Sequence, residues 1–191
     1  MYELPIAVNI NGIEYPIRKR GDYRMVLDVF SVLEDSSITH SERILCALSL
    51  FYEDFDCFDD LLKITDLEGL VKEMYSFFNA DKPENSGVNR KLLDWNSDSA
   101  LVVSAINSVA NKEIRSEEYI HWWTFTSWYM AIGESVLSTV VSIREKILKG
   151  TKLEKWETQY KQENYQYFIW NHQTVEEREA EEWVRQQWNG G

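Results

Sequence analysis

Along most of this chain, apolar residues recur at intervals of three and four positions, the spacing that places side chains on one face of an α-helix. Thr39-x-x-Glu42 and Thr65-x-x-Glu68 are capping-box patterns, which mark helix starts. Only three Pro and eight Gly occur in 191 residues, which leaves room for long helices. The pattern predicts a mainly α fold. We expect helix caps at Asp22, Thr39, Thr65, Ser97, Ser116 and Ser135, a helix stop at Gly150, and a further helix from Lys152 to about Tyr167.

The N-terminal residues follow a different pattern, in which apolar and polar side chains alternate on either side of Asn11-Gly12. This dipeptide favours the two-residue type I′ turn of a β-hairpin. A two-stranded sheet with one apolar face does not stand alone in water, so the hairpin should cover helices or a neighbouring subunit. The predicted face joins three cross-strand pairs, Ile10 with Ile13, Val8 with Tyr15, and Ile6 with Ile17.

The domain organisation follows from these two patterns. We expect residues 1–170 to form one mostly helical domain, with the hairpin packed on a multi-helix bundle. Residues 79–91 are polar and contain Pro83 and Gly87, so we expect a mobile loop there. Residues 171–191 are mostly polar and carry the capping pattern Thr174-x-x-Glu177, which predicts a helical tail.

The charge of the chain argues against several classes of partner. The formal net charge is −12, whereas a duplex-binding surface needs clustered Lys and Arg, so no nucleic-acid partner is expected. Nowhere does the sequence approach the roughly 20 apolar residues of a membrane span, and its start does not resemble a signal peptide, so neither a membrane partner nor secretion is expected. The acidic cluster from Glu53 to Asp60 leaves an alternative open, an inhibitor that mimics DNA and blocks a host nuclease or defence protein.

No pattern in the sequence indicates catalysis or a bound cofactor. His40, His121 and His172 lie far apart and lack partners at metal-ligand spacing, and Cys46 and Cys57 do not form a CxxC motif. Phosphate-binding, nucleophile-elbow and zinc-protease motifs are absent from the sequence. We therefore expect no enzyme activity, metal or cofactor, and we interpret His121 as a structural histidine.

Aromatic residues crowd the region between Tyr119 and Trp170. At Trp122 and Trp123, two adjacent indoles on a helix point about 100° apart, so one core is not expected to hold both. Because Trp and Tyr are enriched at binding hot spots, the excess indicates a protein-binding surface.

Several segments in this region resemble a family of siphophage and prophage proteins from Gram-positive hosts. They include His121-Trp122-Trp123-Thr124-Phe125, Ile143-Arg144 and Leu153-Glu154-Lys155-Trp156. The resemblance implies a tail assembly chaperone encoded next to the tape measure gene. Such a protein would form a ring or spiral homo-oligomer, bind the tape measure protein in the host cytoplasm, and be absent from the mature virion. The residues that we expect to contact the partner or a second copy are Trp122, Trp123, Phe125, Ile143, Arg144, Leu153 and Trp156. Arg144 would pair with a carboxylate, either within the chain or across subunits.

Overall fold

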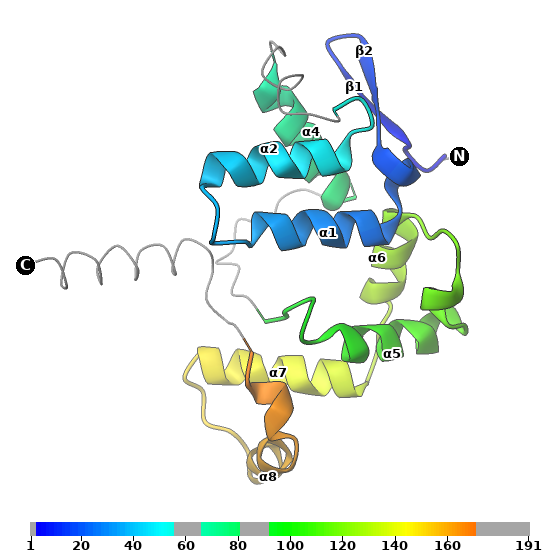
Figure 1. The fold of residues 1–191 in the computed structure, drawn as a ribbon. Helices are drawn as coiled ribbons and strands as arrows, with labels where there is room; N and C mark the ends of the chain where they lie inside the picture. Colours follow the sequence, from blue (N-terminus) through cyan, green and yellow to red (C-terminus); the bar gives the residue numbers. More distant parts are fainter. Residues whose placement is uncertain (1–2, 56–65, 81–91, 171–191) are drawn as a thin grey trace, which may run out of the picture. The chain divides into compact units, whose positions relative to one another are not determined.

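The structure is a computed structural model that describes residues 3–55, 66–80 and 92–170. The chain is mainly helical with a small N-terminal β-hairpin, as the sequence predicted (Figure 1). It divides into two compact units. Unit 1 contains residues 1–86 and 118–126, and unit 2 contains residues 87–117 and 127–191. In the described ranges, no helix has both the length and the apolar character that a membrane crossing requires.

The hairpin of unit 1 consists of β1 (Ala7–Ile10) and β2 (Ile13–Pro16). Its two turn residues both have positive φ, 53° at Asn11 and 86° at Gly12, as a type I′ turn requires. The register confirms the predicted pairs Ile10–Ile13 and Val8–Tyr15. Just beyond the ladder, the Ile17 N–H donates to the Ile6 carbonyl at 2.8 Å, which confirms the third pair.

The apolar face of the hairpin is only partly covered. Ile10 and Ile17 are buried, and the ring of Tyr15 packs edge-on against Tyr52, with ring centroids 6.1 Å apart. Ile6 and Ile13 remain about half exposed, at 46% and 57%. The prediction that the hairpin packs on helices is therefore confirmed, but part of its apolar face stays in contact with solvent.

Three helices complete most of unit 1: α1 (Tyr23–Leu33), α2 (His40–Phe51) and α4 (Leu67–Phe78). The predicted caps at Asp22 and Thr39 are confirmed, because each side chain accepts a hydrogen bond from a backbone N–H of the first turn. Thr65 lies outside the described residues, and the N-cap of α4 is instead Asp66, whose carboxylate accepts from Gly69 N at 2.8 Å.

The predicted helix start at Ser116 is wrong. A short 3-10 helix, η2 (Ile114–Ser116), ends at this residue, and the chain then runs extended until α6 (Trp122–Met130) begins. The extended segment is held in unit 1 by Asp22, whose carboxylate accepts from Ile120 N at 3.0 Å. The Ile120 carbonyl in turn accepts from Tyr23 N at 2.9 Å. Partners almost a hundred positions away thus override the local helical pattern.

Unit 2 is built from α5 (Ser99–Ala110), α7 (Val136–Leu148), α8 (Lys155–Glu163) and η3 (Tyr165–Phe168). The predicted cap Ser135 and the predicted stop at Gly150 are confirmed: Ser135 forms a capping box, and Gly150 has a φ of 67°. The N-cap of α5 is Asp98 rather than the predicted Ser97. The helix expected from Lys152 is shorter, because Glu154 caps it and it ends at Glu163. The predicted tail at 171–191 and most of the predicted loop at 79–91 lie outside the described residues.

Candidate functional site

The two adjacent tryptophans expected at a binding surface lie inside unit 1. The indole N–H of Trp122 donates to the Phe78 carbonyl at 2.9 Å, and that of Trp123 donates to the Phe77 carbonyl at 3.0 Å. Both acceptors are in the last turn of α4, where carbonyls lack partners within the helix. Trp122 is 4% exposed and Trp123 is half-buried. Only Trp122 is fully a core residue, as the divergence of the two indoles predicted, and together the two indoles cap the end of one helix.

Phe125 also belongs to the core of unit 1. Its side chain is 1% exposed, and its ring stacks on Tyr23 with centroids 4.6 Å apart and an interplanar angle of 6°. A side chain this buried presents no area to a partner. Its assignment to a partner-binding surface, like that of Trp122, is corrected to a role in packing.

His121 is the structural histidine that the sequence predicted, and its two ring nitrogens contact Trp123 at the start of α6 and Pro5 near the N-terminus. Its Nδ1 accepts a hydrogen bond from Trp123 N at 3.0 Å, so the ring proton lies on Nε2, which donates to the Pro5 carbonyl at 2.9 Å. Burial is the main cause that lowers the pKa of His121 below its ordinary value. A neutral ring in this one tautomer satisfies both hydrogen bonds.

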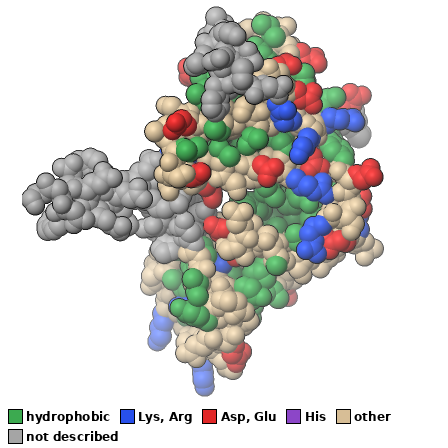
Figure 2. Space-filling model, viewed as in Figure 1, with side chains coloured by type: hydrophobic (Ala, Val, Ile, Leu, Met, Phe, Trp, Pro, Cys, Tyr) green, Lys and Arg blue, Asp and Glu red, His purple; other side chains and the backbone are tan. Residues whose placement is uncertain are grey.

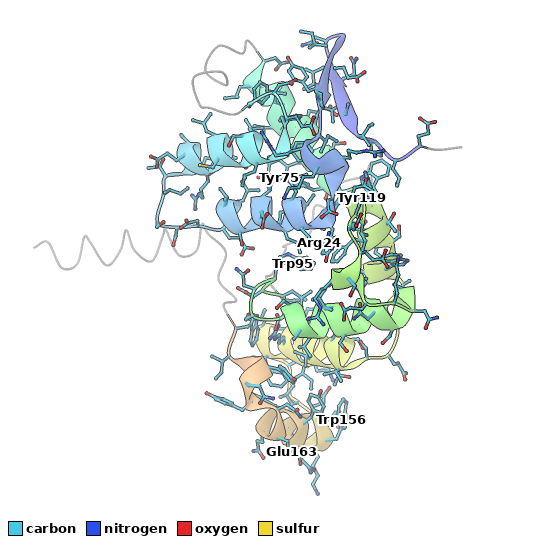
Figure 3. All side chains as sticks on the ribbon, turned by 45° about the vertical axis from the view of Figure 1, so that its right-hand side comes forward. Arg24, Tyr75, Trp95, Tyr119, Trp156 and Glu163 are labelled. Carbon is cyan, nitrogen blue, oxygen red and sulfur yellow. The ribbon has the colours of Figure 1, made fainter. Side chains whose placement is uncertain are left out.

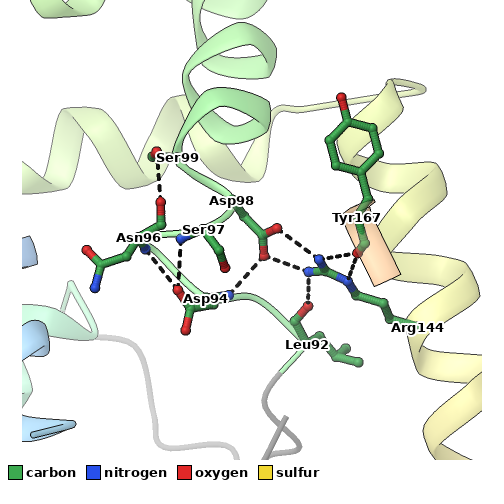
Figure 4. A network of polar contacts seen from close by, with 8 residues as sticks. All are labelled: Leu92, Asp94, Asn96, Ser97, Asp98, Ser99, Arg144 and Tyr167. Atoms are coloured by element: carbon green, nitrogen blue, oxygen red, sulfur yellow. Dashed lines mark hydrogen bonds and ion pairs between the residues drawn. The ribbon is translucent and has the colours of Figure 1, made fainter. Parts of the chain in front are cut away.

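Arg144 lies at the centre of a buried polar network in unit 2 (Figure 4). Its guanidinium makes two hydrogen bonds to the Asp98 carboxylate, at 2.6 and 2.9 Å. It also donates to the Leu92 carbonyl at 2.9 Å and twice to the Tyr167 carbonyl. Arg144 is 1% exposed, and the neighbouring Ile143 is fully buried. Both are among the predicted contact residues, and their burial removes them from a partner surface. The carboxylate that pairs with Arg144 lies within the chain, and Arg144 positions η3 from within.

A second buried contact fixes α8. Glu157 is 2% exposed, and its carboxylate accepts from Lys146 Nζ at 2.6 Å and from Glu154 N at 2.8 Å. The hydrogen bond from Lys146, followed by that from the Glu154 backbone, lowers the pKa of Glu157. Because Lys146 belongs to α7, this contact joins α8 to the rest of unit 2.

Large apolar side chains remain exposed on the segment that these two contacts hold in place. Trp156, Tyr165 and Ile169 are 57%, 62% and 63% exposed, and Leu153 is half-buried. We call these four residues the α8–η3 surface. Figure 3 shows Trp156 and Glu163 projecting outward from α8. Of these four residues, Leu153 also lines an open groove, together with Lys152, Glu154 and Lys155. An exposed indole on a helix that buried contacts hold in place is the arrangement expected of a protein-binding residue.

Two of the seven predicted contact residues, Leu153 and Trp156, belong to the α8–η3 surface, Trp123 is half-buried in unit 1, and two further members of the surface were missed. Tyr165 is one of the aromatic residues between Tyr119 and Trp170, but its spacing in the sequence does not distinguish it from buried neighbours such as Phe168. Ile169 follows η3 and carries no periodic signal.

The remaining predictions about sites concern metals and the acidic cluster. Among the described residues, no group of three His, Cys, Asp or Glu side chains is arranged to hold a metal ion. In the cluster from Glu53 to Asp60, only the residues up to position 55 fall in the described part of the chain. The DNA-mimic hypothesis therefore stays a prediction.

Comparison with known proteins places the chain in a family. The sequence profile of a family described as Bacteriophage Gp15 protein matches residues 1–168. No curated protein and no solved structure gives a significant match. Since the profile covers most of the chain, including both units, this protein belongs to the bacteriophage Gp15 protein family.

Proposed function

We propose that this protein is a phage tail assembly chaperone that binds the tape measure protein and keeps it soluble while the tail is built. The observation that carries the proposal is the α8–η3 surface, where Trp156, Tyr165 and Ile169 are each more than half exposed. Membership in a bacteriophage family supports the biological setting. The protein would act by binding alone, in the host cytoplasm, and would leave before the virion is complete.

The chemistry of this surface suits a helical partner. A tape measure protein is a long helix with apolar stripes, and such stripes bind grooves lined by large apolar side chains. In the α8–η3 surface, an indole and a phenol supply contact area at a low cost in conformational entropy. Lys152 and Lys155 at the adjoining groove would pair with acidic residues that flank the stripe.

Self-association would make this weak site effective. The hairpin leaves Leu4, Ile6 and Ile13 exposed at 44%, 46% and 57%, which is apolar area for a second copy to cover. In a ring or spiral, many copies of one modest site face a long partner together, so the effective concentration multiplies their affinities. The net charge of −12 would keep the loaded assembly in solution.

Co-expression with the tape measure protein tests the proposal. The unmodified chain should keep fragments of the tape measure protein in the soluble fraction and co-purify with them. The double variant Trp156→Ala, Tyr165→Ala should lose both effects while retaining its melting temperature, because neither side chain is buried. Val136→Ala serves as the matched control, since Val136 is a 52% exposed apolar residue of the same unit outside the α8–η3 surface. If the double variant still co-purifies as well as Val136→Ala does, the surface is not the binding site.

A further inference from the structure

A basic turn stands out in this acidic chain. Arg18, Lys19 and Arg20 are consecutive, whereas the chain as a whole has 20 basic and 32 acidic residues. They form η1 (Arg18–Gly21) at the start of α1, with Lys19 and Arg20 exposed. Figure 2 shows several Lys and Arg side chains on the right-hand side of this face, with Asp and Glu side chains among them, and Figure 1 shows the turn that leads into α1. We call Lys19, Arg20 and the adjacent Tyr119 the basic turn.

The backbone of this turn adopts a conformation that ordinary residues avoid. Lys19 has φ 49° and Arg20 has φ 53°, both in the left-handed region, and Gly21 follows with φ 75°. Successive non-glycine residues in this region persist only where the surrounding structure imposes them. The turn is therefore a fixed feature whose charged side chains are held outward.

One local hydrogen bond and one from a distant residue hold the turn. The Tyr119 hydroxyl donates to the Arg20 carbonyl at 2.9 Å, and Asp22 N donates to the Lys19 carbonyl at 3.2 Å. Gly21 packs so closely that a β-carbon there would lie 2.7 Å from Phe77 Cζ. Because the framework is rigid, little conformational entropy would be lost when a partner binds it.

The basic side chains in and next to the turn have different partners. Arg18 points inward and donates to the Tyr52 carbonyl at 3.0 Å, and Arg24 pairs with Asp22. The Arg20 guanidinium lies over the ring of Tyr119, 5.9 Å from its centroid. Within the described ranges, neither Lys19 nor Arg20 has a carboxylate at ion-pair distance. Two exposed cations beside a 42% exposed tyrosine would accommodate an acidic peptide that also carries an aromatic residue.

We propose that the basic turn binds the acidic segment 175–184 of a second copy of this chain. This segment contains five glutamates and one arginine and ends on Trp183-Val184. It therefore offers both the carboxylates and the aromatic side chain that the turn would accept. A nucleic acid would offer phosphates instead, but a chain of net charge −12 repels a polyanion.

The consequence is a head-to-tail contact. The basic turn belongs to unit 1 and the acidic segment to the C-terminal end of unit 2, so the two surfaces differ, and each copy offers one of each. Heterologous contacts of this kind generate rings where they close and spirals where they do not. The inference rests on the proposed function for its biological meaning, and it specifies how copies would join.

A charge-swap experiment on the full-length chain tests the contact. Light scattering across a concentration series should show assembly of the unmodified protein that weakens as NaCl rises from 50 to 500 mM. Lys19→Glu, Arg20→Glu should raise the concentration for half-assembly at least about tenfold. Glu176→Lys, Glu177→Lys should do the same, and combining both pairs in one chain should restore assembly. The control Lys72→Glu, Lys149→Glu changes net charge equally at exposed lysines elsewhere and should assemble normally.

Several results would overturn the proposal. These are a wild-type chain that stays monomeric, assembly that is insensitive to salt, a control that fails like the turn variant, or a combined variant that stays dissociated. Binding of a 30-nucleotide DNA probe that the turn variant abolishes would assign the turn to nucleic acid instead. Trp156→Ala separates the two proposals, because it should assemble normally even though it binds the tape measure protein more weakly.

Discussion

Arg144 and Asp98 form a buried ion pair in which two guanidinium N–H groups meet the two oxygens of one carboxylate, at 2.6 and 2.9 Å. The three other N–H groups donate to the carbonyls of Leu92 and Tyr167. All five donors of the side chain are therefore satisfied without water. The guanidinium also lies over the ring of Trp170, 4.6 Å from its centroid. Arg144, which belongs to α7, thus joins three other parts of unit 2. These are Asp98 at the start of α5, Leu92, and Tyr167 in η3.

Removing the carboxylate of this pair should destabilise unit 2 strongly. Asp98→Ala leaves an uncompensated buried guanidinium, so we expect the free energy of unfolding to fall by about 3–5 kcal/mol. Lys149→Ala is the control, because Lys149 pairs with Glu145 in an exposed site and its loss should cost less than about 1 kcal/mol. Urea titration followed by circular dichroism measures both changes. Equal midpoints for the two variants would show that the buried pair contributes little.

The hydrogen bonds from Trp122 and Trp123 to the end of α4 should contribute unequally to stability. Trp122→Phe removes the N–H that the buried Phe78 carbonyl accepts, which should cost about 1–3 kcal/mol. Trp123→Phe should cost less, because Trp123 is half-buried and water can replace its N–H at the Phe77 carbonyl. Thermal unfolding of the two variants compares these costs. A larger loss for Trp123→Phe than for Trp122→Phe would contradict the assignment.

Gly21 and Gly12 are a matched pair of glycines in left-handed turns. Either change to Ala should cost about 1–2 kcal/mol of conformational energy, because φ is 75° at Gly21 and 86° at Gly12. Gly21→Ala should cost more, since its β-carbon would also lie 2.7 Å from Phe77 Cζ and 3.1 Å from His121 Nε2, whereas nothing lies within 4 Å at Gly12. The difference between the two melting temperatures measures this steric cost. Its absence would mean that η1 is not closely packed against α4.

The lowered pKa of His121 predicts a pH dependence of stability. The unfolded chain has the higher pKa, so it binds more protons as the pH falls below about 6.5. The stabilisation is complete above that pH and is lost as the pH falls through the folded-state pKa. In His121→Asn, the amide oxygen can still accept the Trp123 N–H, but the titratable ring is gone. Unfolding measured between pH 5 and 8 should therefore depend less on pH in the variant, and identical slopes would argue against a neutral buried His121.

The features that the sequence predicted correctly are those set by neighbours a few positions away. Asn11-Gly12 determines the hairpin register because only a two-residue turn fits between the alternating strands. Asp22, Thr39 and Ser135 cap helices through N–H groups two or three residues along the chain. Each of these contacts is local, so composition and spacing are sufficient to find it.

The features that the sequence did not reveal depend on distant partners. Asp98 makes no side-chain cap contact at the start of α5 and turns to Arg144, 46 positions away. The acceptors of the Trp122 and Trp123 indoles are 44 and 46 positions away, so helical geometry alone suggested one indole in the core and one at a surface.

The candidate surface was only partly predictable for the same reason. Trp156 is exposed because Glu157, the next residue, turns inward to Lys146 and fixes the orientation of α8. That contact joins residues 11 positions apart on different helices. Without it, the aromatic residues of this segment could not be divided into buried and exposed positions.

The most direct test of the account is the affinity of the full-length chain for the segment of the tape measure protein that co-purifies with it. Isothermal titration calorimetry should show Trp156→Ala binding at least about tenfold more weakly, a loss of about 1.4 kcal/mol, with an unchanged melting temperature. Trp123→Phe should bind as tightly as the unmodified chain despite its lower melting temperature. Full binding by Trp156→Ala, with binding lost in a folded Trp123→Phe, would contradict the central claim that the α8–η3 surface holds the partner.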